Sequence, residues 1–113
     1  MFMHIPITEF MNLANSGEFE GVHAEPIYCS AMNTGVFHTV KEYDVCEWIV
    51  AGHDHDNDFH GIYKGIHLAY GRKTGFGSYG PSETKQGGRV FEIIGDPYEI
   101  TTWIRDEDGI TDQ

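Results

Sequence analysis

"VCEWIVAGHDHDNDFH", residues 45–60, joins an apolar run to a cluster of histidines and aspartates. Residues 45–51 are rich in β-branched and aromatic side chains, which is typical of a buried strand. Gly52 follows at once and allows the backbone to turn sharply without filling the space ahead of it. His53 and His55 come next, so the pattern predicts a group of potential ligands at the carboxyl end of a strand.

This histidine-rich stretch admits more than one chemistry. A calcium loop of the EF-hand type is excluded, because Phe59 and Gly65 would stand where glycine and glutamate are required. A loose cluster that binds transition metals by charge and imidazole alone is one remaining interpretation. The other is more specific: residues two apart in extended backbone point to the same side, so His53 and His55 present two imidazoles to one metal or to two adjacent ones.

The three aspartates that alternate with these histidines have two possible roles. As hydrogen-bond acceptors they would orient the imidazoles, as acidic side chains beside metal ligands often do. As members of a solvated acidic turn they would have no partner in the chain. The sequence leaves both roles open for Asp54, Asp56 and Asp58.

The amino-terminal half of the chain has the pattern of an α/β unit. Residues 1–6 form a short apolar run that ends at Pro6, which favours a strand leading into a loop, with His4 at the exit. Helical spacing then recurs after Thr8 and again in residues 36–43. Ligands gather beyond the carboxyl ends of strands in such folds, so we expect His4 and His53 at the same edge of a sheet.

The second half of the chain predicts antiparallel hairpins. Residues 59–63 and 66–70 flank one glycine-containing turn, and residues 88–94 and 98–104 flank another. Between the hairpins, residues 71–88 contain six glycines and one proline, which is typical of a solvated flexible loop or of a functional one. The expected fold class is therefore α/β with a mixed sheet and carboxyl-terminal antiparallel hairpins.

Composition limits the partners. With 113 residues the chain is at most one domain, and its formal charge of -11 argues against binding a nucleic acid backbone or an anionic membrane. An anionic substrate would need positive charge from bound metal cations. Cys29 and Cys46 have no CxxC spacing, so we expect buried thiols, with a single bridge as the alternative. No signal peptide or transmembrane segment is visible in the sequence, which leaves the cellular location undetermined.

A family resemblance runs through nearly all of residues 2–105. "GHDHDNDF" after an apolar strand, with "HIP" before it and "GI.LAYGR..G.G.YG" and "GGRVFEI" after it, resembles the carboxyl-terminal portion of calcineurin-like metallophosphoesterases. The branch related to purple acid phosphatases is the most similar. The resemblance implies that residues 1–113 are the carboxyl-terminal part of such a domain, half of a four-layer α/β/β/α sandwich.

The resemblance also implies a site with two metal ions of iron, manganese or zinc, which hydrolyses a small phosphate ester. His4 and His53 would share one ion and His55 would hold its neighbour. The family motifs Asp-x-His, Gly-Asp and Gly-Asn-His have no counterpart ahead of the histidine motif. We therefore expect little or no activity from this chain alone. The alternative is a non-enzymatic module that binds metal weakly, self-associates or assembles with a missing amino-terminal half.

For other side chains the sequence predicts less specific roles. Tyr70, Arg72 and Tyr79 flank the glycine-rich loop and are candidates for lining a substrate pocket, where Arg72 would meet a phosphate oxygen. For the remaining histidines the sequence predicts ordinary roles. We expect surface or cross-strand positions for His60 and His67, and structural or solvated positions for His23 and His38.

Overall fold

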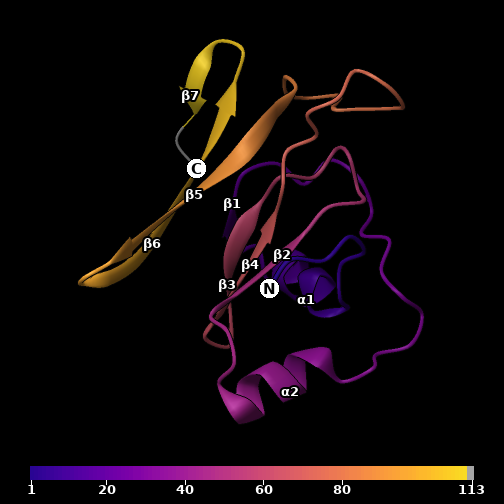
Figure 1. Cartoon of the computed structure of the whole chain (residues 1–113). Coiled ribbons are helices and arrows are strands. Elements are labelled where there is room, and N and C mark those ends of the chain that lie inside the picture. Colours follow the sequence, from indigo (N-terminus) through magenta and orange to yellow (C-terminus); the bar gives the residue numbers. More distant parts are fainter. Residues whose placement is uncertain (112–113) are drawn as a thin grey trace.

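The computed structural model describes residues 1–111 of the chain. Two short helices precede most of the strands, and two sheets are formed (Figure 1). The elements in chain order are α1 (Glu9–Ser16), β1 (Phe19–Glu20), α2 (Val36–Tyr43), β2 (Trp48–Ala51), β3 (His60–Tyr63), β4 (Ile66–Tyr70), β5 (Gly87–Gly95), β6 (Tyr98–Asp106) and β7 (Gly109–Thr111).

The first sheet is mixed and has the strand order β1-β3-β4-β2. β3 and β4 form the expected hairpin around Lys64 and Gly65, both of which adopt positive φ angles. β2 pairs with β4 in parallel, with Trp48 opposite His67. The sequence did not predict β1, a two-residue strand that pairs with β3 in a segment without clear periodicity.

The amino terminus extends this sheet beside β2. Phe2 and Val50 form a parallel bridge, and the backbone N–H groups of Met3 and Gly52 donate to the carbonyls of Val50 and His4. The expected first strand is therefore present as a short extended segment. Because this segment runs parallel to β2, His4 lies beside the residues that follow β2. This is the arrangement expected for two strands that end at the same edge.

The hydrophobic core lies between the two helices and one face of the mixed sheet. Every second residue of β2 and β4 points to this face, because side chains alternate along a strand. The largest buried members include Phe10, Leu13, Ile49, Phe59, Leu68 and Tyr70. In Figure 1, α1 and α2 both lie on the same side of the strands, away from the β5–β6 hairpin.

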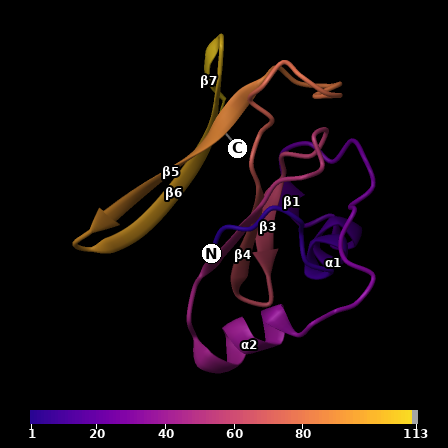
Figure 2. The ribbon, with the colours of Figure 1, turned by 45° about the vertical axis from the view of Figure 1, so that its right-hand side comes forward.

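The second sheet is antiparallel, with the order β5-β6-β7. The β5–β6 hairpin matches the one expected from the sequence, and it projects as an arm beside the mixed sheet (Figure 2). Aromatic contacts join the two sheets: Phe91 of β5 lies edge-on to Trp48 and to Phe2, with ring centroids 5.5 and 5.8 Å apart. The fold class expected from the sequence, mixed α/β with antiparallel hairpins, is confirmed.

Both helices have eight residues. No helix within residues 1–111 is long and apolar enough to cross a bilayer. α1 begins after Thr8 and ends at Gly17, which adopts a left-handed conformation with φ of 72°. Thr8 makes no side-chain cap hydrogen bond, although its position before the helix is the expected one. Cys29 and Cys46 are both free thiols, which confirms the expected unpaired state, but both are half-buried rather than buried.

Candidate metal centre

The imidazoles of His4 and His53 lie next to each other at the edge of the mixed sheet. Their ring centroids are 5.3 Å apart and the rings are inclined by 63°. A Cβ atom on Gly52 would lie in ordinary contact, 3.9 Å from both Nδ1 and the carbonyl oxygen of His4, so Gly52 lies directly beside His4. The adjacency of His4 and His53 expected from their strand exits is confirmed.

His53 adopts a left-handed backbone conformation with φ of 76°, which is uncommon for a residue other than glycine. Nδ1 of its ring lies 2.7 Å from Oδ1 of Asp54. The His53 side chain is 36% exposed, whereas that of Asp54 is fully buried. The carboxylate therefore contacts the imidazole from the interior, and the opposite side of the ring faces outward.

Asp54 is held in place by two donors at its second oxygen. The hydroxyl of Tyr70 donates to Oδ2 at 2.7 Å and the backbone N–H of Tyr28 donates at 3.1 Å. Burial, and then the contact with Asp54, raises the pKa of Tyr70 far above its ordinary value, so its hydroxyl remains a donor. Asp54 is thus an acceptor that contacts an imidazole, which was one of the two roles left open.

Asn57 and Asp58 bind the segment that contains residues 22–25. The amide oxygen of Asn57 accepts from the backbone N–H groups of Ala24 and Glu25, and its nitrogen donates to the Glu25 carbonyl. Oδ1 of Asp58 accepts from the Val22 N–H at 2.8 Å. Asp54, Asn57 and Asp58 are all at most 2% exposed. The interpretation of Asp54 and Asp58 as members of a solvated acidic turn is therefore wrong.

Two arginines converge on Asp58. Nε and an Nη atom of Arg72 contact Oδ2 of Asp58, and Arg89 donates to the carbonyl oxygens of Asp58 and Tyr70. Burial lowers the pKa of Arg89 to about 10. Arg72 is 7% exposed and Tyr70 is fully buried. The structure therefore gives Arg72 and Tyr70 partners inside the chain, and their predicted substrate contacts stay predictions.

The contacts of the His55 ring are with a different residue from those of His4 and His53: it packs against Tyr79 of the glycine-rich loop. The two rings are stacked with centroids 4.4 Å apart and 19° between their planes. Nδ1 of His55 is 3.0 Å from the carbonyl oxygen of Tyr79. Tyr79 is 50% exposed, so of the three predicted substrate-binding residues it alone keeps a large exposed surface.

The described histidines do not form a complete metal site by themselves. Among residues 1–111, no group of three or more histidine, cysteine, aspartate and glutamate side chains is arranged to hold one metal ion. His4 and His53 would supply two ligands to one ion and His55 one ligand to another. Imidazole is a ligand for both zinc and iron, and the metal-binding role of all three residues stays a prediction.

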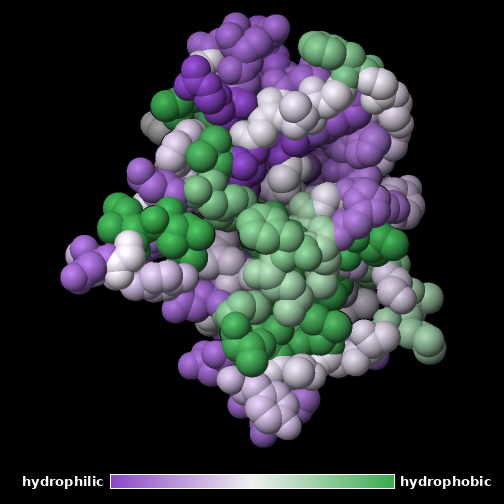
Figure 3. Space-filling model, viewed as in Figure 1, coloured by the Kyte–Doolittle hydropathy of each residue, from purple (hydrophilic) through white to green (hydrophobic). Residues whose placement is uncertain are grey.

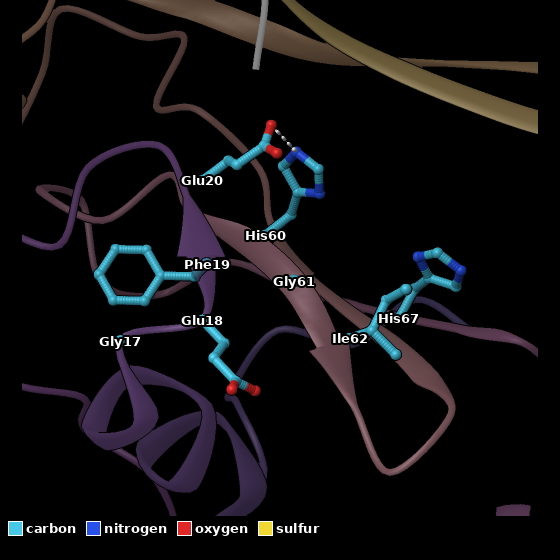
Figure 4. Close-up of a pocket in the computed structure, with 8 residues that line it drawn as sticks. All are labelled: Gly17, Glu18, Phe19, Glu20, His60, Gly61, Ile62 and His67. Carbon is cyan, nitrogen blue, oxygen red and sulfur yellow. Dashed lines mark ion pairs between the residues drawn. The ribbon is translucent and has the colours of Figure 1, made fainter.

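The other histidines have the ordinary positions expected for them. His67 stacks on Trp48 of the neighbouring strand at 4.1 Å, and Nε2 of His60 lies 3.9 Å from Oε2 of Glu20. His60, His67 and Glu20 line a pocket of about 510 Å³, which also includes Gly17 at the carboxyl end of α1 (Figure 4). Exposed His23 packs edge-on against Phe19 and Phe59.

Glu25 belongs to this site but was not predicted from the sequence. Its carboxylate accepts from the hydroxyl of Tyr79 and from the backbone N–H of Asp56. Glu25 lies 30 residues before His55 in the sequence, within a stretch without helical or strand periodicity. No local pattern marks such a residue, because only the tertiary fold brings it to the motif.

Comparison with known proteins gives relatives of one kind. The chain is 31% identical over 95% of its length to "Probable inactive purple acid phosphatase 29" of Arabidopsis thaliana. It is 36% identical over 95% of its length to "Probable inactive purple acid phosphatase 28" of the same plant. The chain is related to the purple acid phosphatases. A third relative, "Probable inactive purple acid phosphatase 14" of Arabidopsis thaliana, is 35% identical over 71% of the chain.

These phosphatase relatives are much longer than the matched segment. The chain spans 30%, 29% and 20% of the lengths of the three relatives. No model of a protein family matches the chain, and no solved structure matches it significantly. The relatives therefore confirm the resemblance to the purple acid phosphatase branch and leave the activity of this chain to be tested.

Proposed function

We propose that this chain supplies three histidine ligands to a two-metal phosphoesterase site whose remaining ligands come from outside its described residues. The adjacency of His4 and His53, with ring centroids 5.3 Å apart across a parallel strand pair, carries the proposal. In a complete domain, the paired ions would polarise a phosphoryl group and supply a hydroxide nucleophile. The substrate class is a small phosphate ester.

The residues around the histidines have roles that suit this proposal. Asp54 contacts His53 from the interior, and partners of this kind orient metal-binding imidazoles in many proteins. His53 has a left-handed backbone, and its ring lies beside that of His4. These features are supplied by the chain itself, before any metal or partner binds.

Calorimetric titration of zinc into the purified chain tests the His4–His53 pair. We expect weak binding that both His53→Ala and His4→Ala reduce strongly, while His23→Ala, which changes an exposed histidine elsewhere, does not affect it. Neutral imidazole is the ligand, so binding should weaken from neutral to mildly acidic pH. Binding that ignores His4 would contradict the shared site.

The chain alone should hydrolyse model phosphomonoesters and diesters at no more than a trace rate with manganese, iron or zinc. Of the three proposed histidine ligands, His4 and His53 serve one ion, and no group of three or more metal ligands is arranged for one ion within residues 1–111. The measurement is product release by the pure chain with each metal. Robust turnover that disappears in His53→Ala would show that the chain is a complete enzyme.

A second candidate function is assembly through an apolar surface. Hydrophobic residues gather beside the β5–β6 hairpin, where they surround a pocket of about 280 Å³ (Figure 3). Phe2, Val45, Ile93 and Tyr98 line this pocket and are each at least 60% exposed. Contiguous exposed apolar surface of this kind marks interaction sites in many proteins.

We propose that another polypeptide segment, or a second copy of the chain, covers this surface. Sedimentation velocity over a range of concentrations separates the two functions. A concentration-dependent dimer that Ile93→Ser weakens would favour assembly through this surface. A monomer at all concentrations would exclude self-association and leave a different polypeptide as the partner.

A further inference from the structure

Tyr79 contacts His55 through its ring and through its carbonyl oxygen, and the carbonyl contact determines which ring nitrogen is free. The rings are stacked at 4.4 Å, and Nδ1 of His55 lies 3.0 Å from the carbonyl oxygen of Tyr79. A carbonyl oxygen only accepts hydrogen bonds, so Nδ1 must carry the proton. The lone pair of the neutral imidazole is then on Nε2, at the far side of the ring.

Glu25 holds the Tyr79 side chain in this position. The hydroxyl of Tyr79 lies 3.2 and 3.0 Å from the two carboxylate oxygens of Glu25. The same carboxylate accepts from the Asp56 N–H at 2.7 Å, directly after His55. A carboxylate oxygen accepts the hydrogen bond and the phenol hydroxyl donates it. The hydroxyl is therefore a persistent donor to Glu25.

Glu25 itself is fixed by a buried residue of the histidine motif. Its backbone N–H donates to the amide oxygen of Asn57, and its carbonyl accepts from the amide nitrogen. Asn57 is 1% exposed. The chain of contacts thus runs from buried Asn57 to Glu25, from Glu25 to Tyr79, and from Tyr79 to the ring of His55.

The glycine after Tyr79 permits this close approach. A Cβ atom on Gly80 would lie 2.6 Å from Oδ1 of Asp56 and 3.1 Å from Cβ of His55, and its φ is +63°. The Ser82 N–H donates to the same Asp56 oxygen at 2.6 Å. Backbone of the glycine-rich loop therefore lies directly against the second histidine of the motif, which a larger residue would prevent.

We propose that Tyr79 is a positioning residue for His55, with Glu25 as its anchor, and that the pair presents Nε2 of His55 as the free ligand atom. This assigns Tyr79 a role in orienting a ligand, different from the substrate contact predicted from sequence. The use of that ligand atom for a metal ion rests on the proposed function. The orientation and the tautomer of His55 do not.

Nitrogen-15 NMR of the metal-free chain tests the tautomer directly. At a pH where imidazoles are neutral, the long-range proton–nitrogen spectrum distinguishes a protonated Nδ1 from a protonated Nε2, and the spectrum of His55→Ala assigns the signals. We expect a single tautomer with the proton on Nδ1. A mixture of tautomers, or a proton on Nε2, in the unmodified chain would overturn the proposal.

Substitutions at Tyr79 test the positioning. Tyr79→Ala removes the stacked ring and the hydroxyl, so His55 should change from one tautomer to a mixture. Tyr79→Phe keeps the ring and should have a smaller effect in the same direction. Glu25→Gln keeps an acceptor for the Tyr79 hydroxyl, so this variant should retain most of the single-tautomer signal. Tyr28→Phe is the matched control, because Tyr28 is 56% exposed and only its backbone N–H is used.

Zinc titration of the same variants separates this proposal from the proposed function. If both hold, Tyr79→Ala should weaken the part of zinc binding that His55→Ala removes, by about tenfold to a hundredfold. A single Nδ1-protonated tautomer without any zinc binding would support the positioning role and contradict the metal site. A tautomer that is unchanged in Tyr79→Ala would contradict the positioning role whatever the zinc affinity.

Discussion

Asp58 and Arg72 form an ion pair inside the protein, and each side chain is only 3% exposed. The pair joins the end of the histidine motif to the start of the glycine-rich loop. Asp58 also accepts from the Val22 N–H, and Arg72 donates to the Lys85 carbonyl at 3.0 Å. One buried pair therefore ties together the histidine motif, the glycine-rich loop and the segment at Val22, at positions outside the helices and strands.

Replacing Arg72 by Ala should destabilise the chain strongly. The change removes the Arg72 guanidinium from the buried Asp58 carboxylate, and breaking a buried ion pair costs about 3–5 kcal/mol. The measurement is the free energy of unfolding from urea titration. The exposed ion pair of Lys85 with Asp108 provides the control: Lys85→Ala should have no measurable effect. Equal losses in the two variants would contradict a structural role for the buried pair.

Tyr70→Phe should lower the free energy of unfolding by about 1–3 kcal/mol. The substitution removes the hydroxyl that donates to Oδ2 of Asp54 at 2.7 Å, while the aromatic ring stays in the core. Tyr43→Phe is a matched control, because Tyr43 is 72% exposed. An unchanged stability of Tyr70→Phe would mean that Asp54 finds another donor.

Gly61→Ala should destabilise the chain by about 1–3 kcal/mol through steric overlap. A Cβ atom at this position of β3 would lie 2.6 Å from the Glu18 carbonyl oxygen and 3.0 Å from Cδ1 of Leu13. The backbone oxygen has little freedom to move, since β1 pairs with β3 here. Gly88→Ala in β5 meets nothing within 4 Å and should unfold at the same urea concentration as the unmodified chain.

His67 should contribute to a loss of stability at acidic pH. Burial lowers the pKa of His67 from its ordinary value of 6.5, and nearby Glu47 partly opposes this shift. Below that ordinary value the unfolded chain binds the proton more readily than the folded chain, so stability falls as pH falls. His67→Gln should therefore flatten the decline of unfolding free energy between about pH 7 and pH 5.

The control for this pH dependence is His38→Gln on the surface of α2. His38 is exposed and lies outside the mixed sheet, so its replacement should leave the slope unchanged. The measurement is urea unfolding at a series of pH values for the three proteins. Parallel curves for His67→Gln and the unmodified chain would show that the shift at His67 does not contribute.

Local sequence determined the elements that depend on neighbouring residues. The β3–β4 and β5–β6 hairpins follow from alternating apolar residues on either side of turn residues, and the helices from apolar residues at helical spacing. The position of His53 after β2 was also predictable, because an apolar strand and a glycine precede it. Parallel strands end at the same edge of a sheet, so the sequence also predicted that His4 and His53 lie next to each other.

Only the tertiary structure decided the roles of polar residues that are distant in sequence. Asp54 and Asp58 had the same local pattern as solvated acidic residues, and their burial depends on the segment around Val22 and Tyr28 folding over them. Glu25 reaches Tyr79 across 54 residues. A buried carboxylate requires partners to compensate for lost hydration, and those partners are contributed by loops whose paths no periodic pattern specifies.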